Sequence, residues 1–153
     1  MTQDDIRNYL SANQSVYIQV ASPQDGSPEA AWGDTFVFLK RKNGELGKMP
    51  FITIVTSDYE GFDYESNLNR PDIFRLNMDV GREKFAELFS FTPKEFSANR
   101  SKFDFSASDV LFPHPVYGEY GWASVISPRP GSVAMVKSLL DYSLHRAGAD
   151  TAV

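Results

Sequence analysis

Apolar and polar side chains alternate with a period of two in several short segments of the chain. The clearest case is residues 73–80, where apolar positions alternate with polar ones that include Arg75 and Asn77. This alternation predicts a strand with one buried face and one polar face. The same alternation, or a short run of β-branched and aromatic residues, predicts further strands at residues 15–21, 34–39, 51–56 and 122–126.

Other segments have the apolar spacing of a helix. After Thr2, a residue that caps helices well, an apolar stripe begins at Ile6 and predicts an opening helix. A longer stripe predicts a final helix over residues 132–147, with Val136, Leu140 and Leu144 packed on the sheet and Gly148 as its cap. Short helices are predicted at residues 82–89 and from the capping box of residues 92–95.

The connections between these elements indicate how the strands pair. The turn sequence at residues 42–45 predicts an antiparallel hairpin between the second and third strands. Residues 98–107 are interpreted as an irregular, polar loop. Grouped strands with helices at the ends favour a single α+β domain over residues 1–153. We expect a mainly antiparallel sheet of about five strands with helices packed on one face, in the order α-ββββ-α(α)-β-α.

Composition narrows the classes of function. The chain has 153 residues, which fits one domain, and it has no cysteine, which excludes thiolate catalysis and Cys-ligated metals. Its first residues are acidic and it has no apolar run of membrane-spanning length, so we expect a cytoplasmic protein without a membrane partner. The net charge of −5 disfavours nucleic acid as a partner. A basic surface stripe would favour it, and its candidates are Arg7, Lys40, Arg41, Lys42 and Lys48.

His114 is the first candidate for chemistry. Pro113 and Pro115 fix the backbone on both sides of it, so its imidazole is held in one place. Such a histidine can act as a general acid or base or contact a ligand, and it can also be a structural residue that bonds the backbone. His145 is predicted to lie solvated in the last turn of the final helix. No residues complete a catalytic set with His114, and we expect no metal and no cofactor.

Two further segments resemble ligand loops only superficially. Residues 58–65 are acidic and rich in tyrosine, but the spacing does not match a calcium loop, so we expect a solvated loop. Residues 44–48 lack the spacing of a phosphate loop, and Met49 stands where that motif requires Ser or Thr.

The candidate ligand site therefore centres on the segment that follows Pro113. Tyr117 and Trp122 offer stacking surface, and Gly118 and Gly121 can turn the chain back within a few residues. Arg75 and Asn77 point to the same side of their strand and could bind an anion or a carbonyl group. We expect a ligand site that contains the candidates His114, Tyr117 and Trp122, joined by Arg75 and Asn77. The opposing interpretation is that Tyr117 and Trp122 only plug the end of the sheet.

Several segments in a fixed order carry a resemblance to a known family. They are the segment from Trp32 to Phe38, the segment from Phe74 to Asn77, the segment from Pro113 to Gly118, and the pair Gly121-Trp122. Together they resemble a family of small bacterial proteins defined only as a domain of unknown function (DUF6194), and the resemblance covers residues 34–146. That family implies no established activity.

A more remote resemblance is to the YjbR/MmcQ type, whose frataxin-like fold has been called a double-wing DNA-binding fold. Trp32-Gly33 before a strand and Trp122 in the last strand carry it. Three functions therefore stay open: a non-catalytic domain that binds a small ligand or a protein, which we favour; a nucleic-acid-binding protein of the double-wing type; and an enzyme that uses His114 as general acid or base.

Overall fold

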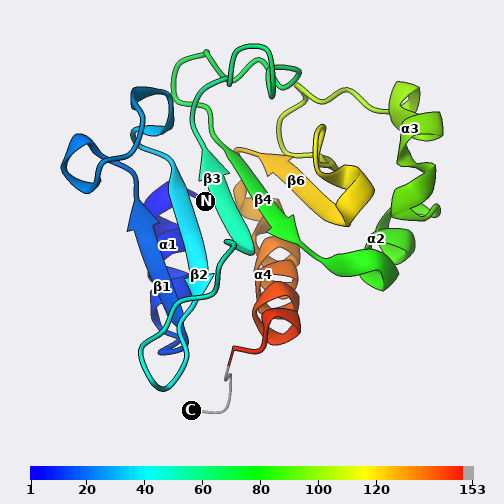
Figure 1. Cartoon of the computed structure of the whole chain (residues 1–153). Coiled ribbons are helices and arrows are strands. Elements are labelled where there is room, and N and C mark those ends of the chain that lie inside the picture. Colours follow the sequence, from blue (N-terminus) through cyan, green and yellow to red (C-terminus); the bar gives the residue numbers. More distant parts are fainter. Residues whose placement is uncertain (150–153) are drawn as a thin grey trace.

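A six-stranded sheet forms the centre of the protein, with the strand order β1-β2-β3-β4-β6-β5 and antiparallel pairing throughout (Figure 1). The computed structural model describes residues 1–149. The strands are β1 (Val16–Val20), β2 (Thr35–Leu39), β3 (Ile52–Val55), β4 (Arg75–Asp79), β5 (Leu111–Pro113) and β6 (Trp122–Ile126). The predicted α+β class with an antiparallel sheet is confirmed.

Two helices cover one face of this sheet, as predicted. They are α1 (Gln3–Ser11) and α4 (Val133–Ala147), which lie behind the strands in Figure 1. Two shorter helices, α2 (Gly81–Phe89) and α3 (Phe96–Asn99), lie to the side, beyond β6. The opposite face of the sheet is therefore left to loops, and this division decides where a site can form.

The main core lies between the sheet and the two covering helices. Ile6 and Leu10 of α1 and Leu140 of α4 are fully buried, as are Leu76 and Met78 on β4. The predicted stripe of the last helix is confirmed, since Val136 and Leu144 are buried as well. Apolar burial of this kind contributes roughly 1.5–3 kcal/mol for each large side chain, so the α4 stripe fixes that helix on the sheet.

The helix ends and the hairpin also follow the sequence signals. The Thr2 hydroxyl accepts a hydrogen bond from the Asp5 amide, and Gly148 ends α4 in the left-handed conformation, with φ of 96°. β2 and β3 pair with Phe36 opposite Thr53, and Gly44 lies in the long loop that joins them. The antiparallel hairpin predicted from residues 42–45 is thus confirmed.

Two segments differ from the prediction. β5 is a sixth strand that the sequence pattern did not reveal, because it has only three residues and ends in Pro113. Residues 98–107 are not a polar loop, since Phe105 is buried and Phe103 packs against it with ring centroids 6.2 Å apart. Phe105 also packs edge-on against Phe112 of β5 at 5.6 Å. Alternate phenylalanines in this segment therefore close the edge of the sheet that β5 forms.

Candidate functional site

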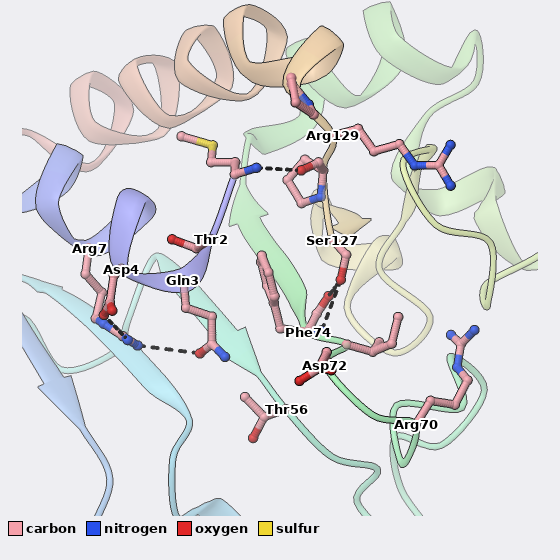
Figure 2. Close-up of a pocket in the computed structure, with 14 residues that line it drawn as sticks. Thr2, Gln3, Asp4, Arg7, Thr56, Arg70, Asp72, Phe74, Ser127 and Arg129 are labelled. Carbon is pink, nitrogen blue, oxygen red and sulfur yellow. Dashed lines mark hydrogen bonds and ion pairs between the residues drawn. The ribbon is translucent and has the colours of Figure 1, made fainter.

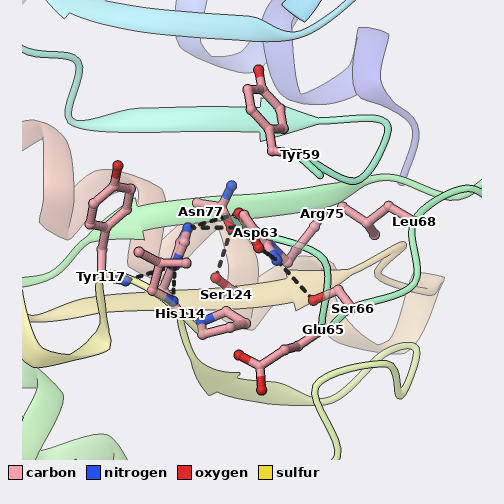
Figure 3. Close-up of polar contacts among 12 residues, drawn as sticks. Tyr59, Asp63, Glu65, Ser66, Leu68, Arg75, Asn77, His114, Tyr117 and Ser124 are labelled. Carbon is pink, nitrogen blue, oxygen red and sulfur yellow. Dashed lines mark hydrogen bonds and ion pairs between the residues drawn. The ribbon is translucent and has the colours of Figure 1, made fainter. Parts of the chain in front are cut away.

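The five predicted site residues lie together on the face of the sheet opposite to α1 and α4. Arg75 and Asn77 come from β4, His114 directly follows β5, and Tyr117 lies in the loop that leads to Trp122 at the start of β6. The rings of His114 and Tyr117 have centroids 4.8 Å apart, and the Tyr117 and Trp122 rings are 6.1 Å apart. Arg75 lies 3.2 Å from the His114 ring. These residues are therefore close in space, and Figure 3 shows four of them, Arg75, Asn77, His114 and Tyr117.

Arg75 is the centre of the polar part of this cluster. Its guanidinium makes a two-pronged ion pair with Asp63, with Nη1 3.0 Å from Oδ1 and Nη2 2.5 Å from Oδ2. Nη1 also donates to the Ser66 hydroxyl at 2.8 Å, and Nε donates to Asn77 Oδ1 at 2.8 Å. A paired, planar arrangement of this kind is the strongest contact that an arginine makes with a carboxylate. It fixes the loop that contains Asp63 and Ser66 onto the sheet.

Asn77 extends the network across three neighbouring strands. Its amide nitrogen donates to the Thr53 hydroxyl on β3 at 3.0 Å, and its oxygen accepts from the Ser124 hydroxyl on β6 at 2.7 Å. Thr53, Asn77 and Ser124 are direct partners in the strand register, so the sheet itself lines them up. Every polar atom of the Asn77 side chain is thus occupied by the protein.

His114 is held by the loop that follows it. Its Nδ1 accepts hydrogen bonds from the backbone amides of Val116 at 3.0 Å and Tyr117 at 2.9 Å. An accepting Nδ1 carries no proton, so the neutral ring is protonated on Nε2. That nitrogen faces Arg75 and is 3.9 Å from Asp63 Oδ2, which is too long for a hydrogen bond.

The surroundings of His114 keep it uncharged. Only 3% of the residue is exposed, and burial together with the Arg75 guanidinium lowers the pKa of His114 well below its ordinary value. Two backbone amides occupy Nδ1, and Nε2 is buried beside the Arg75 guanidinium. The ring can orient the loop through Nδ1, but it is poorly placed to exchange protons with a bound molecule.

One expectation about this region is wrong. The acidic loop is not solvated throughout, because Asp63 is 7% exposed and paired with Arg75. Under this loop Arg75 and Asn77 are fully buried and hydrogen-bonded to each other. Both findings have one cause. The chain between β3 and β4 folds back over the sheet, and the sequence pattern cannot show that a distant loop will cover a strand.

A second polar cluster anchors the beginning of the same loop. The fully buried Asp34 accepts from the Tyr59 hydroxyl at 2.5 Å and from the Thr56 amide and hydroxyl at 2.9 Å each. Burial raises the pKa of Asp34 above its ordinary value, and these hydrogen bonds oppose that rise. Burial, and then the Asp34 carboxylate, raise the pKa of Tyr59. The loop is therefore fixed at both Tyr59 and Asp63.

The part of the cluster that solvent reaches is aromatic. Tyr117 packs against Phe62 with centroids 6.0 Å apart, against Trp122 at 6.1 Å and against Tyr120 at 6.5 Å. Tyr120 is 70% exposed, Phe62 52% and Tyr117 39%. We call Phe62, Tyr117, Tyr120 and Trp122 the aromatic surface. Sequence reasoning missed Phe62 and Tyr120, although both lie in segments that are rich in aromatic residues and contain no lysine or arginine.

Arg100 joins the two loops that carry the aromatic surface. Its Nη1 donates to the Pro115 carbonyl at 2.6 Å, next to His114, and its Nη2 pairs with the Glu65 carboxylate. The guanidinium also lies over the Phe96 and Phe105 rings, 5.1 and 5.0 Å from their centroids. Arg100 thus ties the loop of Phe62 to the loop of Tyr117 from the outside, as Arg75 does from the inside.

A cavity of about 740 Å³ lies apart from this cluster, between the start of α1 and the turn before α4 (Figure 2). Gln3, Thr56, Asp72 and Phe74 line it, and it contains none of the five predicted residues. Arg7 at its wall donates to Asp4 at 2.7 Å and to Thr35 at 2.9 Å. The lining carries charges of both signs, including Asp72 and Arg129, so the cavity defines no clear ligand class.

Residues 1–149 contain neither a metal-binding cluster nor a membrane-spanning helix. That part of the chain holds no group of three or more His, Asp or Glu side chains arranged to bind a metal ion. None of the helices described for it is long and apolar enough to cross a membrane.

Comparison with known proteins gives one match. Neither the curated proteins nor the solved structures contain a significant match to this chain. The remote resemblance to the YjbR/MmcQ type therefore stays a prediction. The model of a family of unknown function, DUF6194, matches residues 1–152, which extends the resemblance seen in residues 34–146 over almost the whole sequence. The chain belongs to the DUF6194 family.

Proposed function

We propose that this protein is a non-catalytic binding domain and that its aromatic surface binds a ligand with a positively charged group. The observation that carries the proposal is the composition of the two loops, residues 57–69 and 114–122. Both are rich in aromatic residues, both contain carboxylates, and neither contains lysine or arginine. Aromatic faces and carboxylates attract a cation, and an exposed cation–π contact is worth about 0.5–1 kcal/mol, or about 2 when desolvated.

The charges around the aromatic surface support a cation over an anion. The two arginines that approach it are neutralised by ion pairs, Arg75 by Asp63 and Arg100 by Glu65. Glu119 lies beside Tyr120 and is exposed, and Glu60 is exposed near Phe62. Within residues 1–149, neither glutamate forms an ion pair. The field at the surface is therefore negative.

The rigidity of the two loops also supports a binding role. Arg75, Arg100 and His114 fix them through hydrogen bonds and ion pairs, so the rings are held in position before a ligand arrives. A pre-organised surface loses less conformational entropy on binding than a flexible loop does. The buried contacts of these three residues hold the rings of the aromatic surface in place, as a binding surface requires.

The same geometry argues against the enzymatic interpretation of His114. A general acid or base needs a nitrogen within reach of the substrate and a pKa near the working pH. The Nδ1 of His114 is occupied by two backbone amides, its Nε2 is buried, and its pKa is lowered. We therefore assign His114 a positioning role for Tyr117.

Binding is tested by NMR titration with choline and with its uncharged isostere 3,3-dimethyl-1-butanol. We expect choline to shift the signals of Phe62, Tyr117 and Tyr120 and the neutral isostere to bind at least several-fold more weakly. Tyr120→Ala should weaken choline binding by about 2- to 30-fold, the range that one cation–π contact covers. Trp32→Ala is the matched control, because Trp32 is also exposed (42%) but belongs to neither of the two loops. Equal binding of the two compounds, or shifts that lie elsewhere, would refute the proposal.

Nucleic-acid binding is a second candidate, and one observation favours it. Of the five basic residues proposed for a stripe, Lys40, Arg41, Lys42 and Lys48 lie exposed around the β2–β3 loop. Arg7 is not among them, because it bonds Asp4 and Thr35. Such a cluster would give non-specific binding that weakens steeply with salt. Fluorescence anisotropy with a labelled duplex at 20 and 200 mM salt, on wild type and on a Lys40→Gln/Arg41→Gln/Lys42→Gln variant, tests this candidate.

A further inference from the structure

The outer edge of β1 is an unpaired strand edge. Within residues 1–149, β1 is the first strand of the sheet and pairs only with β2. The Lys40 amide donates to the Ser15 carbonyl, and the Ala21 amide donates to the Asp34 carbonyl. Odd-numbered residues of β1 therefore bond β2, and by the alternation of an antiparallel ladder the even-numbered ones point away from it. The amides of Ile18 and Val20 and the carbonyls of Val16, Ile18 and Val20 lie along the free edge.

This edge lacks the features that normally prevent strands from pairing. Residues 8–24 contain no charged side chain, and residues 15–21 contain no proline. Natural proteins usually place lysine, proline or a bulge on an exposed edge. The opposite edge of the same sheet is protected, because β5 has only three residues and ends in Pro113. The edge of β1 is therefore open to pairing with another strand, whereas the edge of β5 is protected.

We propose that two copies of this chain associate through β1, antiparallel to one another and centred on Ile18. In that register Ile18 pairs with Ile18 of the second copy, and Val16 pairs with Val20. The outward-facing amides of Ile18 and Val20 then each find a carbonyl, and the two sheets become continuous. Two-fold interfaces of this kind are the commonest in homo-oligomers, and they require a surface that is complementary to itself.

The charge and exposure of the edge favour a second copy as the occupant. The chain carries a net charge of −5, so most pairs of like surfaces would repel one another. β1 itself has no charged side chain, although the Asp25 carboxylate accepts a hydrogen bond from Gln19 at 2.9 Å, so two copies of this edge repel one another less than charged surfaces would. Tyr17 and Val20 are each 44% exposed, and they would be partly covered by Gln19 and Val16 of the second copy. This inference is independent of the ligand proposed for the aromatic surface.

Sedimentation velocity over about 1–500 μM tests the association. We expect wild type to dimerise and Val20→Pro to raise the dissociation constant at least about tenfold, since it removes one edge amide from each copy and none that bonds β2. Val20→Thr keeps the amide and the β-branch and should dimerise like wild type. Circular dichroism confirms that each variant is folded. A wild type that stays monomeric over the whole range would overturn the proposal.

The register has its own test, because the chain contains no cysteine. Tyr17→Cys and Gln19→Cys variants are mixed and oxidised. In the proposed register these positions face one another in a non-hydrogen-bonded pair, whose Cα spacing of about 4.5 Å suits a disulfide. We expect the mixed disulfide to form much faster than either self-linked product. Equal rates for all three products would refute the β1 pairing, even if the protein is dimeric.

Discussion

Removal of the Arg75 guanidinium is the most direct test of the buried network. Arg75→Met keeps most of the length of the side chain but leaves Asp63, 7% exposed, without its ion-pair partner. The Ser66 hydroxyl and Asn77 Oδ1 each lose a donor as well, although Asn77 keeps the hydrogen bond from Ser124. Loss of one partner of a buried ion pair typically costs about 3–5 kcal/mol. That is a large part of the roughly 5–15 kcal/mol by which a domain of this kind is stable.

Urea denaturation followed by tryptophan fluorescence measures this loss. With a slope of about 2 kcal/mol per molar urea, the midpoint should fall by about 1.5–2.5 M. Lys84→Met is the control, because Lys84 forms a surface ion pair with Glu87 at 3.3 Å that is worth about 1 kcal/mol at most. The comparison shows whether the buried ion pair stabilises the protein more than the surface ion pair does.

A double variant separates the cost of the unpaired Asp63 carboxylate from the cost of lost packing. Asp63→Asn removes the carboxylate that Arg75→Met leaves unpaired, so the combination should be at least about 1 kcal/mol more stable than the sum of the two single losses predicts. If Arg75→Met costs under about 1 kcal/mol, as Lys84→Met does, then the loop of Asp63 is not docked on the sheet in solution. The pre-organised aromatic surface would then lose its structural basis.

Three further predictions concern stability. Leu140→Ala should cost about 2–5 kcal/mol in urea melts, because Leu140 is fully buried; a loss below about 0.5 kcal/mol would mean that the α4 stripe is not packed. Burial raises the pKa of Asp34, so its ionisation opposes folding as pH rises above the ordinary pKa of an aspartate. The free energy of unfolding of Asp34→Asn minus that of wild type should therefore be more favourable to the variant at pH 7 than at pH 3. Melts at both pH values measure this difference, and the opposite trend would contradict the prediction. The lowered pKa of His114 contributes stability that is present above about pH 6.5 and is lost as pH falls. An NMR titration in which the His114 ring protonates near pH 6.5 would disprove its burial.

The sequence predicted the elements well because their signals are local. The alternation in residues 73–80 and the stripe of Val136, Leu140 and Leu144 each depend on side chains that one strand or helix presents to a single core. The turn at Gly44 and the cap at Gly148 are equally local, since backbone conformation decides them. The five candidate site residues were found from residue type and from the prolines around His114. They lie together because β4 pairs with β6.

Only the tertiary structure decided what those residues do. Arg75 forms a buried ion pair because the loop of residues 57–70 folds back over β4. The sequence pattern within β4 gives no sign of that loop. The same loop brings Phe62 against Tyr117, across a long stretch of sequence. His114 was recognised as immobilised, but its neutral state arises from burial beside a guanidinium. Local sequence specifies backbone conformation and amphipathic faces, whereas burial and charge are set by segments that meet only when the chain folds.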